Sequence, residues 1–188
     1  MEGPEEVPSG KEHWETVYRT KPPETVGWYQ PVPMASLGLI ERLGLPQNAP
    51  IIDVGGGDSY LSDHLYQKGF TDLTVLDISG AALQRAQERY GREAEKIRWV
   101  ESDILEFTAD RAYTLWHDRA AFHFLTGTSQ IGRYLEIARM AIPPGGFLIL
   151  GTFSDKGPST CSGLPVQRYS IPQLEVTVAP HFEKIRGV

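Results

Sequence analysis

The sequence has a single cysteine, Cys161, and no apolar run long enough to cross a bilayer. One cysteine excludes an intramolecular disulfide framework and a zinc site built from cysteines. A lone thiol fits a reducing compartment. Residues 1–11 are acidic and rich in proline and glycine, without the apolar centre of a secretory signal. We therefore expect a cytoplasmic protein with no membrane partner.

An excess of basic residues is also missing. Lysine and arginine number 18 against 24 aspartates and glutamates, which gives a net charge of −6. Because phosphate recognition needs a basic face, we expect no nucleic-acid partner. The 188 residues, 40% of them hydrophobic, suffice for one soluble globular domain. We predict a disordered N-terminal tail over residues 1–10 and a single domain over residues 11–188.

Short apolar runs alternate with helical patterns along most of the chain. This alternation predicts an α/β fold with a doubly wound, mostly parallel sheet and helices on both faces. Predicted strands cover residues 51–54, 73–77, 97–100, 113–116 and 147–153, with a further candidate at 181–185. Predicted helices cover residues 34–43, 59–68, 80–90, 130–141 and a last one that Ser170 and Gln173 cap, ending at Val178.

Two segments outside this alternation are candidates for covering a site. Residues 11–33 are predicted to form an arm, with a short helix that Pro22 and Pro23 separate from a loop. Residues 154–169 are rich in glycine and proline and are predicted to form a lid over the substrate.

A glycine-rich loop follows the first predicted buried strand. It comprises Asp53, Val54, Gly55, Gly56, Gly57, Asp58 and Ser59. Glycines there let the backbone turn sharply and let a ligand approach closely. The bulky Tyr60 disfavours a dinucleotide fingerprint, and a phosphate-loop lysine is absent. The acids Asp53 and Asp58 suit a cationic ligand, whereas the alternative is a turn without a ligand.

Two more acids lie at the carboxyl ends of the next two predicted strands. Asp77 lies 24 residues after Asp53, where an acid accepts hydrogen bonds from ribose hydroxyls, although a helix-capping role is the alternative. Asp103 follows the third strand, where it would accept from an adenine amino group while Ile104 stacks on the ring. A surface acid is the alternative there. Because the carboxyl ends of parallel strands meet in one crevice, these acids are predicted to converge.

This ordered set resembles the class I S-adenosylmethionine-dependent methyltransferases. The matching residues are Asp53, Gly55, Gly57, Asp77, Asp103 and the turn from Pro144 to Phe147, and the resemblance covers residues 12–188. Residues 12–18 are similar to the arm of small protein-lysine methyltransferases. Residues 116–124 and 161–169 are similar to their bacterial relatives, and thiol and thiopurine methyltransferases have a comparable Asp-Arg pair. Family members end the sheet with an antiparallel hairpin, for which the residues after His181 are too few, so that hairpin is predicted to be incomplete.

The resemblance implies S-adenosyl-L-methionine as the cofactor and assigns residues to it. Asp53 is expected to hold the ammonium group, and aromatic rings to close over the cationic methionine end. A satellite hydrophobic cluster is the alternative for the rings. The implied cofactor-binding residues are Trp14, Tyr18, Trp28, Asp53, Gly55, Gly56, Gly57, Ser59, Asp77, Ile78, Asp103, Ile104 and His117.

The methyl acceptor is expected beyond the fourth and fifth strands. The predicted catalytic residues are His117 as a general base, Asp118 to orient an amine, and Arg119, for which an ion pair with Asp118 is the alternative. His123 is predicted to be a core histidine. The predicted substrate-binding residues are Tyr29, Phe153 and Arg168. No metal is expected, and Cys161 has no activating neighbour that would make it a nucleophile.

These observations predict an S-adenosylmethionine-dependent methyltransferase acting on a small-molecule thiol or amine. Methylation of a protein lysine is the alternative acceptor, because a protein substrate needs an open groove where a small acceptor needs a pocket under a lid. A non-catalytic cofactor-binding partner subunit is the alternative from another class. We expect a monomer or a weak homodimer.

Overall fold

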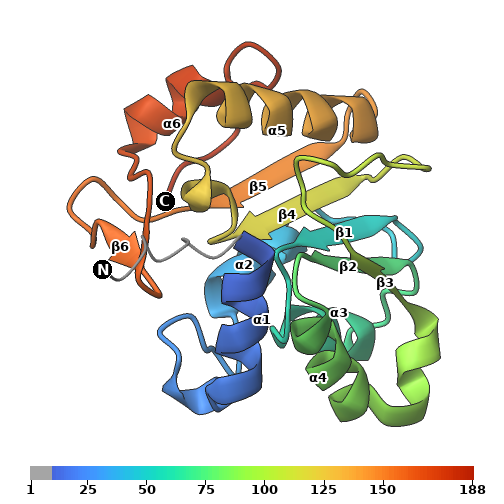
Figure 1. Cartoon of the computed structure of the whole chain (residues 1–188). Helices are drawn as coiled ribbons and strands as arrows, with labels where there is room; N and C mark the ends of the chain where they lie inside the picture. Colours follow the sequence, from blue (N-terminus) through green and yellow to red (C-terminus); the bar gives the residue numbers. More distant parts are fainter. Residues whose placement is uncertain (1–9) are drawn as a thin grey trace, which may run out of the picture.

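Five parallel strands form the central sheet in a computed structural model that describes residues 10–188 (Figure 1). Their order is β3-β2-β1-β4-β5. The strands are β1 (Ile51–Val54), β2 (Leu73–Asp77), β3 (Ile97–Glu101), β4 (Leu115–Arg119) and β5 (Phe147–Gly151). The chain moves outward from β1 to β3 and then returns to the other side of β1. Ligand sites in open α/β sheets lie at the carboxyl ends of the strands where the order reverses, here between β1 and β4.

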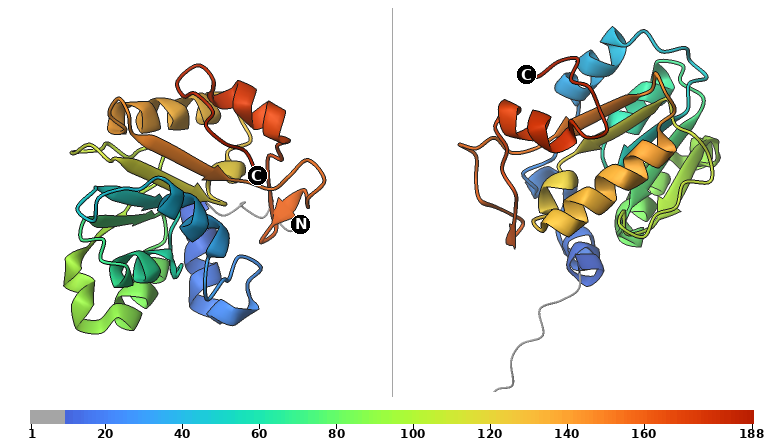
Figure 2. Two further views of the ribbon diagram at one scale, coloured as in Figure 1. Left: turned by 180° about the vertical axis from the view of Figure 1, so that it is seen from behind. Right: turned by 90° about the horizontal axis from the view of Figure 1, so that it is seen from above.

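Helices cover both faces of this sheet, as the alternation of strands and helices predicts (Figures 1 and 2). One face carries α2 (Met34–Arg42), α3 (Leu61–Gln67) and α4 (Gly80–Tyr90), which bury Leu37, Leu61 and Leu83 against the strands. The other face carries α5 (Thr128–Ala141) and α6 (Ile171–Val178), where Trp116 and Tyr134 lie fully buried. Two apolar layers therefore hold the sheet and fix the positions of its strand ends.

Two smaller pieces flank the carboxyl edge of the sheet. The helix α1 (Gly10–Thr20) packs against α4 and leads through the 3-10 turn η1 (Pro23–Thr25) into a loop. The strands β6 (Thr160–Cys161) and β7 (Leu164–Pro165) form an antiparallel hairpin inside the segment predicted to be a lid. Two further 3-10 turns are η2 (Gly91–Lys96) and η3 (Phe122–Phe124).

The structure corrects two predicted strands. The fourth strand begins and ends later than predicted, so that His117, Asp118 and Arg119 belong to β4 rather than to a loop after it. Polar residues favour a loop in a sequence-based prediction, but here buried partners form hydrogen bonds with these side chains inside the sheet. The prediction of a strand at 181–185 is also wrong. This stretch begins in the turn after α6 and pairs with no strand.

The remaining expectations about segments have mixed outcomes. The last helix has the predicted capping box, in which the Ser170 hydroxyl accepts from the Gln173 amide N–H. The predicted tail at residues 1–9 lies outside the described residues, and Gly10 already belongs to α1. Among residues 10–188, no helix is both long and apolar enough to cross a membrane. The same residues contain no cluster of three or more side chains able to hold a metal ion.

Candidate functional site

A cavity of about 380 Å³ lies at the carboxyl ends of β1, β2 and β4. Of the predicted site residues, it brings together Trp14, Tyr18, Trp28, Asp53, Gly55, Gly56, Ser59, Asp77, Ile78, Asp103, Ile104, His117 and Arg119. Residues from the loop after β4 and from the β6–β7 hairpin complete the wall, among them Ala120, Ala121, Phe124, Leu125, Gln130, Cys161, Leu164 and Pro165. The strand ends thus form the floor of the cavity, and two segments distant in sequence form its sides.

The glycine loop fits tightly between its neighbours. Gly55 and Gly57 have φ angles of +63° and +47°, a left-handed conformation that favours glycine. A Cβ atom on Gly55 would collide with Ala121, and one on Gly57 would lie 2.8 Å from the Tyr18 Oη atom. Gly57 is not among the residues that line the cavity, and its lack of a side chain lets the Tyr18 ring approach the loop.

Asp77 is buried at the end of β2, where its Oδ1 atom accepts the backbone N–H of Ser79 at 2.9 Å. Burial raises the pKa of this carboxyl to about 7, and the nearby charges of Asp58 and Asp53 add to the shift. Asp103, after β3, is exposed, and its Oδ1 atom accepts the N–H of Leu105 at 2.8 Å. Both acids line the cavity.

The second acid of the glycine loop has a different role from the one its sequence position suggests. The Asp58 carboxylate pairs with the Arg85 guanidinium of α4 at 2.9 Å and does not line the cavity. Its negative charge is therefore paired with a side chain of the protein. Of the two loop acids expected to attract a cationic ligand, only Asp53 lies at the cavity.

His117 is buried and uses both ring nitrogens within the protein. Its Nδ1 atom lies 2.7 Å from Asp53 Oδ1, and its Nε2 atom lies 2.9 Å from the Ser36 hydroxyl of α2. The parallel register pairs Asp53 directly with His117, so the two side chains project from adjacent strands on the same face. With neither nitrogen free, this arrangement does not provide the general base that we expected.

Asp118 points to the opposite face of the sheet. Its carboxylate accepts the Tyr134 hydroxyl at 2.7 Å and the N–H groups of Ala121 and Phe122 at 2.9 and 3.1 Å. It is fully buried away from the cavity, and burial raises its pKa to about 6. The structure therefore contradicts the prediction that Asp118 orients an acceptor amine.

Arg119 lines the cavity without the ion pair to Asp118 that was the alternative interpretation. Its Nη2 atom donates to the carbonyl oxygen of Trp28 at 3.2 Å. Among the described residues that line the cavity, Arg119 alone carries a permanent positive charge. This side chain links the end of β4 to the arm that precedes the sheet.

Aromatic side chains of the arm gather over the cavity. The ring of Trp14 packs against Trp28 and Phe124 at centroid distances of 5.6 and 5.0 Å, and Tyr18 lies 6.2 Å from Trp28. These rings pack on one another and also line the cavity. The functional interpretation and the hydrophobic-cluster alternative are therefore compatible.

The three predicted substrate-binding residues do not line the cavity. Tyr29 packs against Tyr60, and the exposed Arg168 donates to the carbonyl oxygen of Gly157 at 3.1 Å. Phe153 lies 4.7 Å from the ring of His123. His123 is fully buried, which lowers its pKa to about 4 and confirms the prediction of a core histidine.

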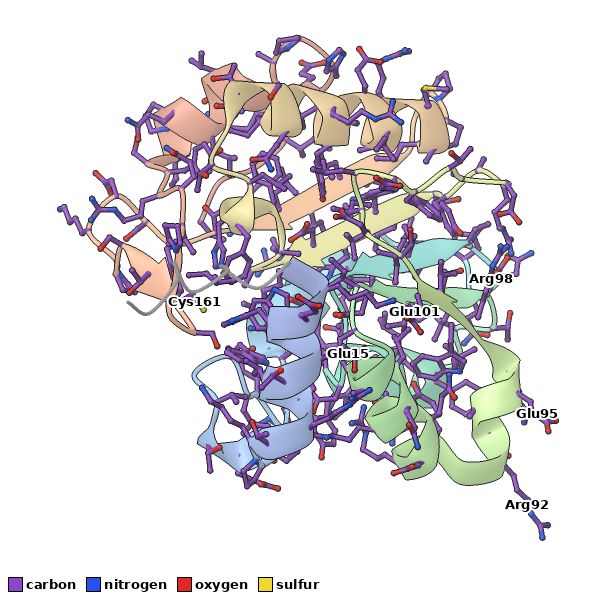
Figure 3. All side chains as sticks on the ribbon, in the orientation of Figure 1. Glu15, Arg92, Glu95, Arg98, Glu101 and Cys161 are labelled. Atoms are coloured by element: carbon purple, nitrogen blue, oxygen red, sulfur yellow. The ribbon has the colours of Figure 1, made fainter. Side chains whose placement is uncertain are left out.

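Contacts with α4 and with the end of β3 fix the arm beside the cavity. Glu15 accepts the N–H of Ala81 at 3.3 Å, and Lys11 pairs with Glu101 at 2.5 Å. Arg85 donates to the carbonyl oxygens of Tyr18 and Lys21. Figure 3 shows Glu15 between α1 and α4.

The sequence also matches a described family. A family model described as "Methyltransferase domain" matches residues 51–146, a little over half of the chain. The match runs from the start of β1 to the turn before β5, and so includes the glycine loop and the three acids of the cavity. The chain belongs to this methyltransferase family. Its sheet order and motif are those of the class I members, which use S-adenosylmethionine.

Curated methyltransferases are similar to this domain over a small part of their own length. The bovine (Bos taurus) eEF1A lysine and N-terminal methyltransferase is 22% identical over 142 residues, which are 74% of this chain and 20% of that protein. The Mus musculus protein of the same name is 24% identical over 144 residues, with the same shares of the two chains. The chain thus spans about a fifth of the length of these curated relatives.

Solved structures share the fold of this methyltransferase domain. The CcbJ methyltransferase from Streptomyces caelestis superposes with a TM-score of 0.65 at 14% identity, covering 89% of this chain and 84% of that one. A structure described as "Conversion of a Disulfide Bond into a Thioacetal Group during Echinomycin Biosynthesis" gives a TM-score of 0.68 at 22% identity, covering 90% and 77%. At these identities the similarity establishes the fold.

The residues at the cavity fit the cofactor of this family. Gly56 gives the ligand side of the loop no Cβ, where one would lie 2.8 Å from Asp53 Oδ2. Asp77 and Asp103 offer carboxylate oxygens to hydroxyl and amino donors, and Ile78 and Ile104 provide apolar walls for a flat ring. The cavity therefore combines a close backbone approach, acceptors and apolar surface, which are the features that a nucleoside bearing an amino acid requires.

Sequence reasoning missed several residues of the cavity wall. Ala120 has a φ of +74°, a conformation that is costly for a non-glycine residue and often found at functional sites. Leu164 and Pro165 reach the cavity only because the β6–β7 hairpin folds toward it. Behind the wall, Ser36 contacts His117, which lies 81 residues later in the chain. No motif in the sequence marks these positions, because their roles arise from contacts between distant segments.

Proposed function

We propose that the chain transfers the methyl group of S-adenosylmethionine to a small-molecule thiol or amine. The observation that carries this proposal is the cavity where Asp53, Asp77 and Asp103 meet at the carboxyl edge of the sheet. Its side walls come from the α1 arm and the β6–β7 hairpin. A site with walls on several sides suits a small acceptor better than a protein surface.

The bound cofactor would supply an activated methyl group on a cationic sulfonium. The role of the chain is then mainly to align this group with the acceptor and to exclude water. Asp77 would accept the ribose hydroxyls, Asp103 would accept the adenine amino group, and Asp53 would face the ammonium group. Trp14 and Trp28 also line the cavity, and aromatic rings there would favour the cationic end of the cofactor.

The acceptor would approach from the side of the loop after β4. Phe124, Leu125, Leu164 and Pro165 offer apolar surface there, and Arg119 offers one positive charge. Because His117 and Asp118 have protein partners for their polar atoms, we assign them to the framework of the site rather than to proton removal. A thiol or amine that releases its proton to solvent before transfer needs no base from the chain.

Methylation of a protein lysine is the second candidate acceptor chemistry. It is favoured by the curated relatives, which are named eEF1A lysine and N-terminal methyltransferases. Against it stand the walls that the hairpin and the arm form around the cavity.

Calorimetric titration with S-adenosylhomocysteine, with NADH as a control ligand, tests the cofactor. We expect saturable binding of S-adenosylhomocysteine alone, and at least roughly tenfold weaker binding by the Asp77→Ala variant, since each lost charged hydrogen bond is worth about 1.5–3 kcal/mol. Unchanged affinity in that variant would contradict the ribose assignment. Exposed Asp110, which pairs with Arg98 far along the chain from the glycine loop, provides the matched control Asp110→Ala.

Labelled methyl donor then tests the acceptor. The chain is incubated with panels of small thiols, small amines and lysine-containing peptides, and incorporation is counted for each panel. We expect label in a thiol or an amine. Label in peptides alone would replace the small acceptor by a protein lysine, and no label in any panel would favour a binding subunit.

A further inference from the structure

A hydrogen-bonded chain of three buried side chains runs from α2 to the cavity. The Ser36 hydroxyl lies 2.9 Å from His117 Nε2, and His117 Nδ1 lies 2.7 Å from Asp53 Oδ1. The exposed fractions of the three residues are 4%, 2% and 5%. Of the three, His117 and Asp53 line the cavity, whereas Ser36 lies behind them.

The order of groups is that of a serine–histidine–aspartate triad, but its placement excludes a nucleophilic serine. Attack requires the hydroxyl to face a bound substrate, and Ser36 does not line the cavity. The end of the chain that faces the cavity is instead the carboxylate. Ser36 can therefore influence a bound ligand only through His117 and Asp53.

We propose that Ser36 is a positioning residue for cofactor binding, which acts through His117 to fix the Asp53 carboxylate toward the methionine end of S-adenosylmethionine. This inference rests on the proposed function. No residue between 30 and 50 belongs to the glycine loop or to the segment that the family model matches, so the role is not visible in the motif.

The hydrogen-bond chemistry gives this arrangement one direction. A neutral imidazole that donates its Nδ1–H to Asp53 must accept at Nε2, and the Ser36 hydroxyl is the donor there. This fixes the tautomer and the plane of the ring.

The other oxygen of Asp53 couples the chain to the glycine loop. A Cβ on Gly56 would lie 2.8 Å from Asp53 Oδ2, so the carboxylate is already close to the loop backbone. A rotation of the carboxylate would therefore disturb both the loop and the charge that faces the cavity. Holding it in place lowers the cost of ordering the site when the ligand binds.

The test compares two buried serines on the same face of the sheet. Ser36→Ala removes the hydroxyl that orients His117, whereas Ser62→Ala removes an equally buried hydroxyl of α3, also 4% exposed, that does not line the cavity. Calorimetry with S-adenosylhomocysteine should show roughly two- to tenfold weaker binding for Ser36→Ala, the worth of one buried hydrogen bond. Ser62→Ala should bind as the wild type does.

A second variant separates positioning from general loosening of the fold. His117→Asn keeps an N–H donor for Asp53 but cannot reach Ser36, so adding Ser36→Ala to it should cause no further loss of affinity. Should His117→Asn fail to fold, the ¹⁵N resonances of the His117 imidazole decide instead. In that case Ser36→Ala should shift the Nε2 signal of the folded chain, and Ser62→Ala should leave it unchanged.

Two results would overturn the inference: wild-type affinity in Ser36→Ala, or the same loss from Ser36→Ala with and without His117→Asn. In the resonance measurement, an Nε2 signal indifferent to Ser36→Ala would overturn it as well. Failure of the proposed function gives a different pattern, because the unmodified chain would then not bind S-adenosylhomocysteine.

Discussion

Two adjacent residues of β4 belong to two different buried hydrogen-bond networks. Because successive side chains of a strand point to opposite faces, His117 faces α2 and Asp118 faces α5. The first system ends at the cavity, and the second ends in the core at Tyr134. Two adjacent polar residues of one strand can therefore belong to the cavity and to the core separately.

The hydroxyl of Tyr134 is predicted to stabilise the fold. It donates to Asp118 at 2.7 Å and accepts from Trp116 Nε1 at 2.9 Å, all in the fully buried core. Tyr134→Phe would leave the Trp116 N–H and the Oδ2 atom of Asp118 without this partner, while Asp118 Oδ1 keeps its two backbone donors. We therefore expect a loss of about 2–3 kcal/mol in the free energy of unfolding. Urea denaturation followed by fluorescence measures this loss.

Tyr113→Phe is the matched control, because the Tyr113 hydroxyl is also fully buried but has no hydrogen-bond partner within the described protein. Its removal should leave the stability unchanged or raise it. Equal losses in the two variants would contradict the role assigned to the Tyr134 hydroxyl.

Asp77 is expected to give part of the pH dependence of stability. Burial raises its pKa to about 7, so the folded chain holds a proton there that the unfolded chain has released. The contribution to stability is complete below the unfolded pKa of about 4 and is lost as the pH rises through about 7. Wild-type stability should therefore fall across this window.

The variant Asp77→Asn removes the titration and keeps an oxygen for the Ser79 N–H. We expect it to be more stable than the wild type at pH 8 by an amount on the order of 2 kcal/mol, with the difference shrinking toward pH 5. It should also bind S-adenosylhomocysteine more weakly. Denaturation curves at several pH values would refute this account if the two proteins kept a constant difference.

At the scale of elements, the arm depends on α4 for its position. Arg85 joins the carboxylate of Asp58 to the carbonyl oxygens of Tyr18 and Lys21, and so connects the glycine loop to the end of α1. Arg85→Met would leave the buried Asp58 unpaired and release the arm. We expect faster trypsin cleavage after the exposed Arg19, followed by mass spectrometry of the fragments.

Arg92→Met is the control for this experiment. Arg92 lies on η2 and points into solvent, away from the arm (Figure 3). Its replacement should leave the rate of cleavage after Arg19 as in the wild type. Similar rates for Arg85→Met and the wild type would show that other contacts, such as Lys11 with Glu101, hold the arm.

The elements divide into those with local signals and those without. The strand β1, the glycine loop and the cap of α6 are predictable because a short buried run, glycines and the Ser170–Gln173 pair act within a few residues. The limits of β4 are not, since its polar residues are satisfied by Ser36 and Tyr134 from distant helices. The expected strand at 181–185 fails for a related reason, because strand pairing depends on a partner that local sequence does not reveal.

At the scale of the whole molecule, the order of strands explains why the cofactor site is easier to predict than the acceptor site. Parallel topology brings the acids at the carboxyl ends of β1, β2 and β3 to one edge whatever the loops contain. The side of the cavity proposed for the acceptor is lined by η3, the β6–β7 hairpin and the arm, whose approach to one another follows from tertiary packing. The predicted Tyr29, Phe153 and Arg168 lie outside the cavity for this reason.

Ligand-dependent stability of the whole chain gives the final prediction. A ligand that binds only the folded state at 100 times its Kd adds about 2.7 kcal/mol to stability. For a chain of 188 residues this corresponds to a rise of roughly 5–10 °C in the unfolding midpoint. S-adenosylhomocysteine should produce this shift, and NADH at the same concentration should not. Asp77→Asn at pH 8 should start from a higher midpoint and shift less, because the change that stabilises its fold removes an acceptor from the cavity. A shift with NADH alone would point to a nicotinamide site, and a full shift in the variant would remove Asp77 from the binding site.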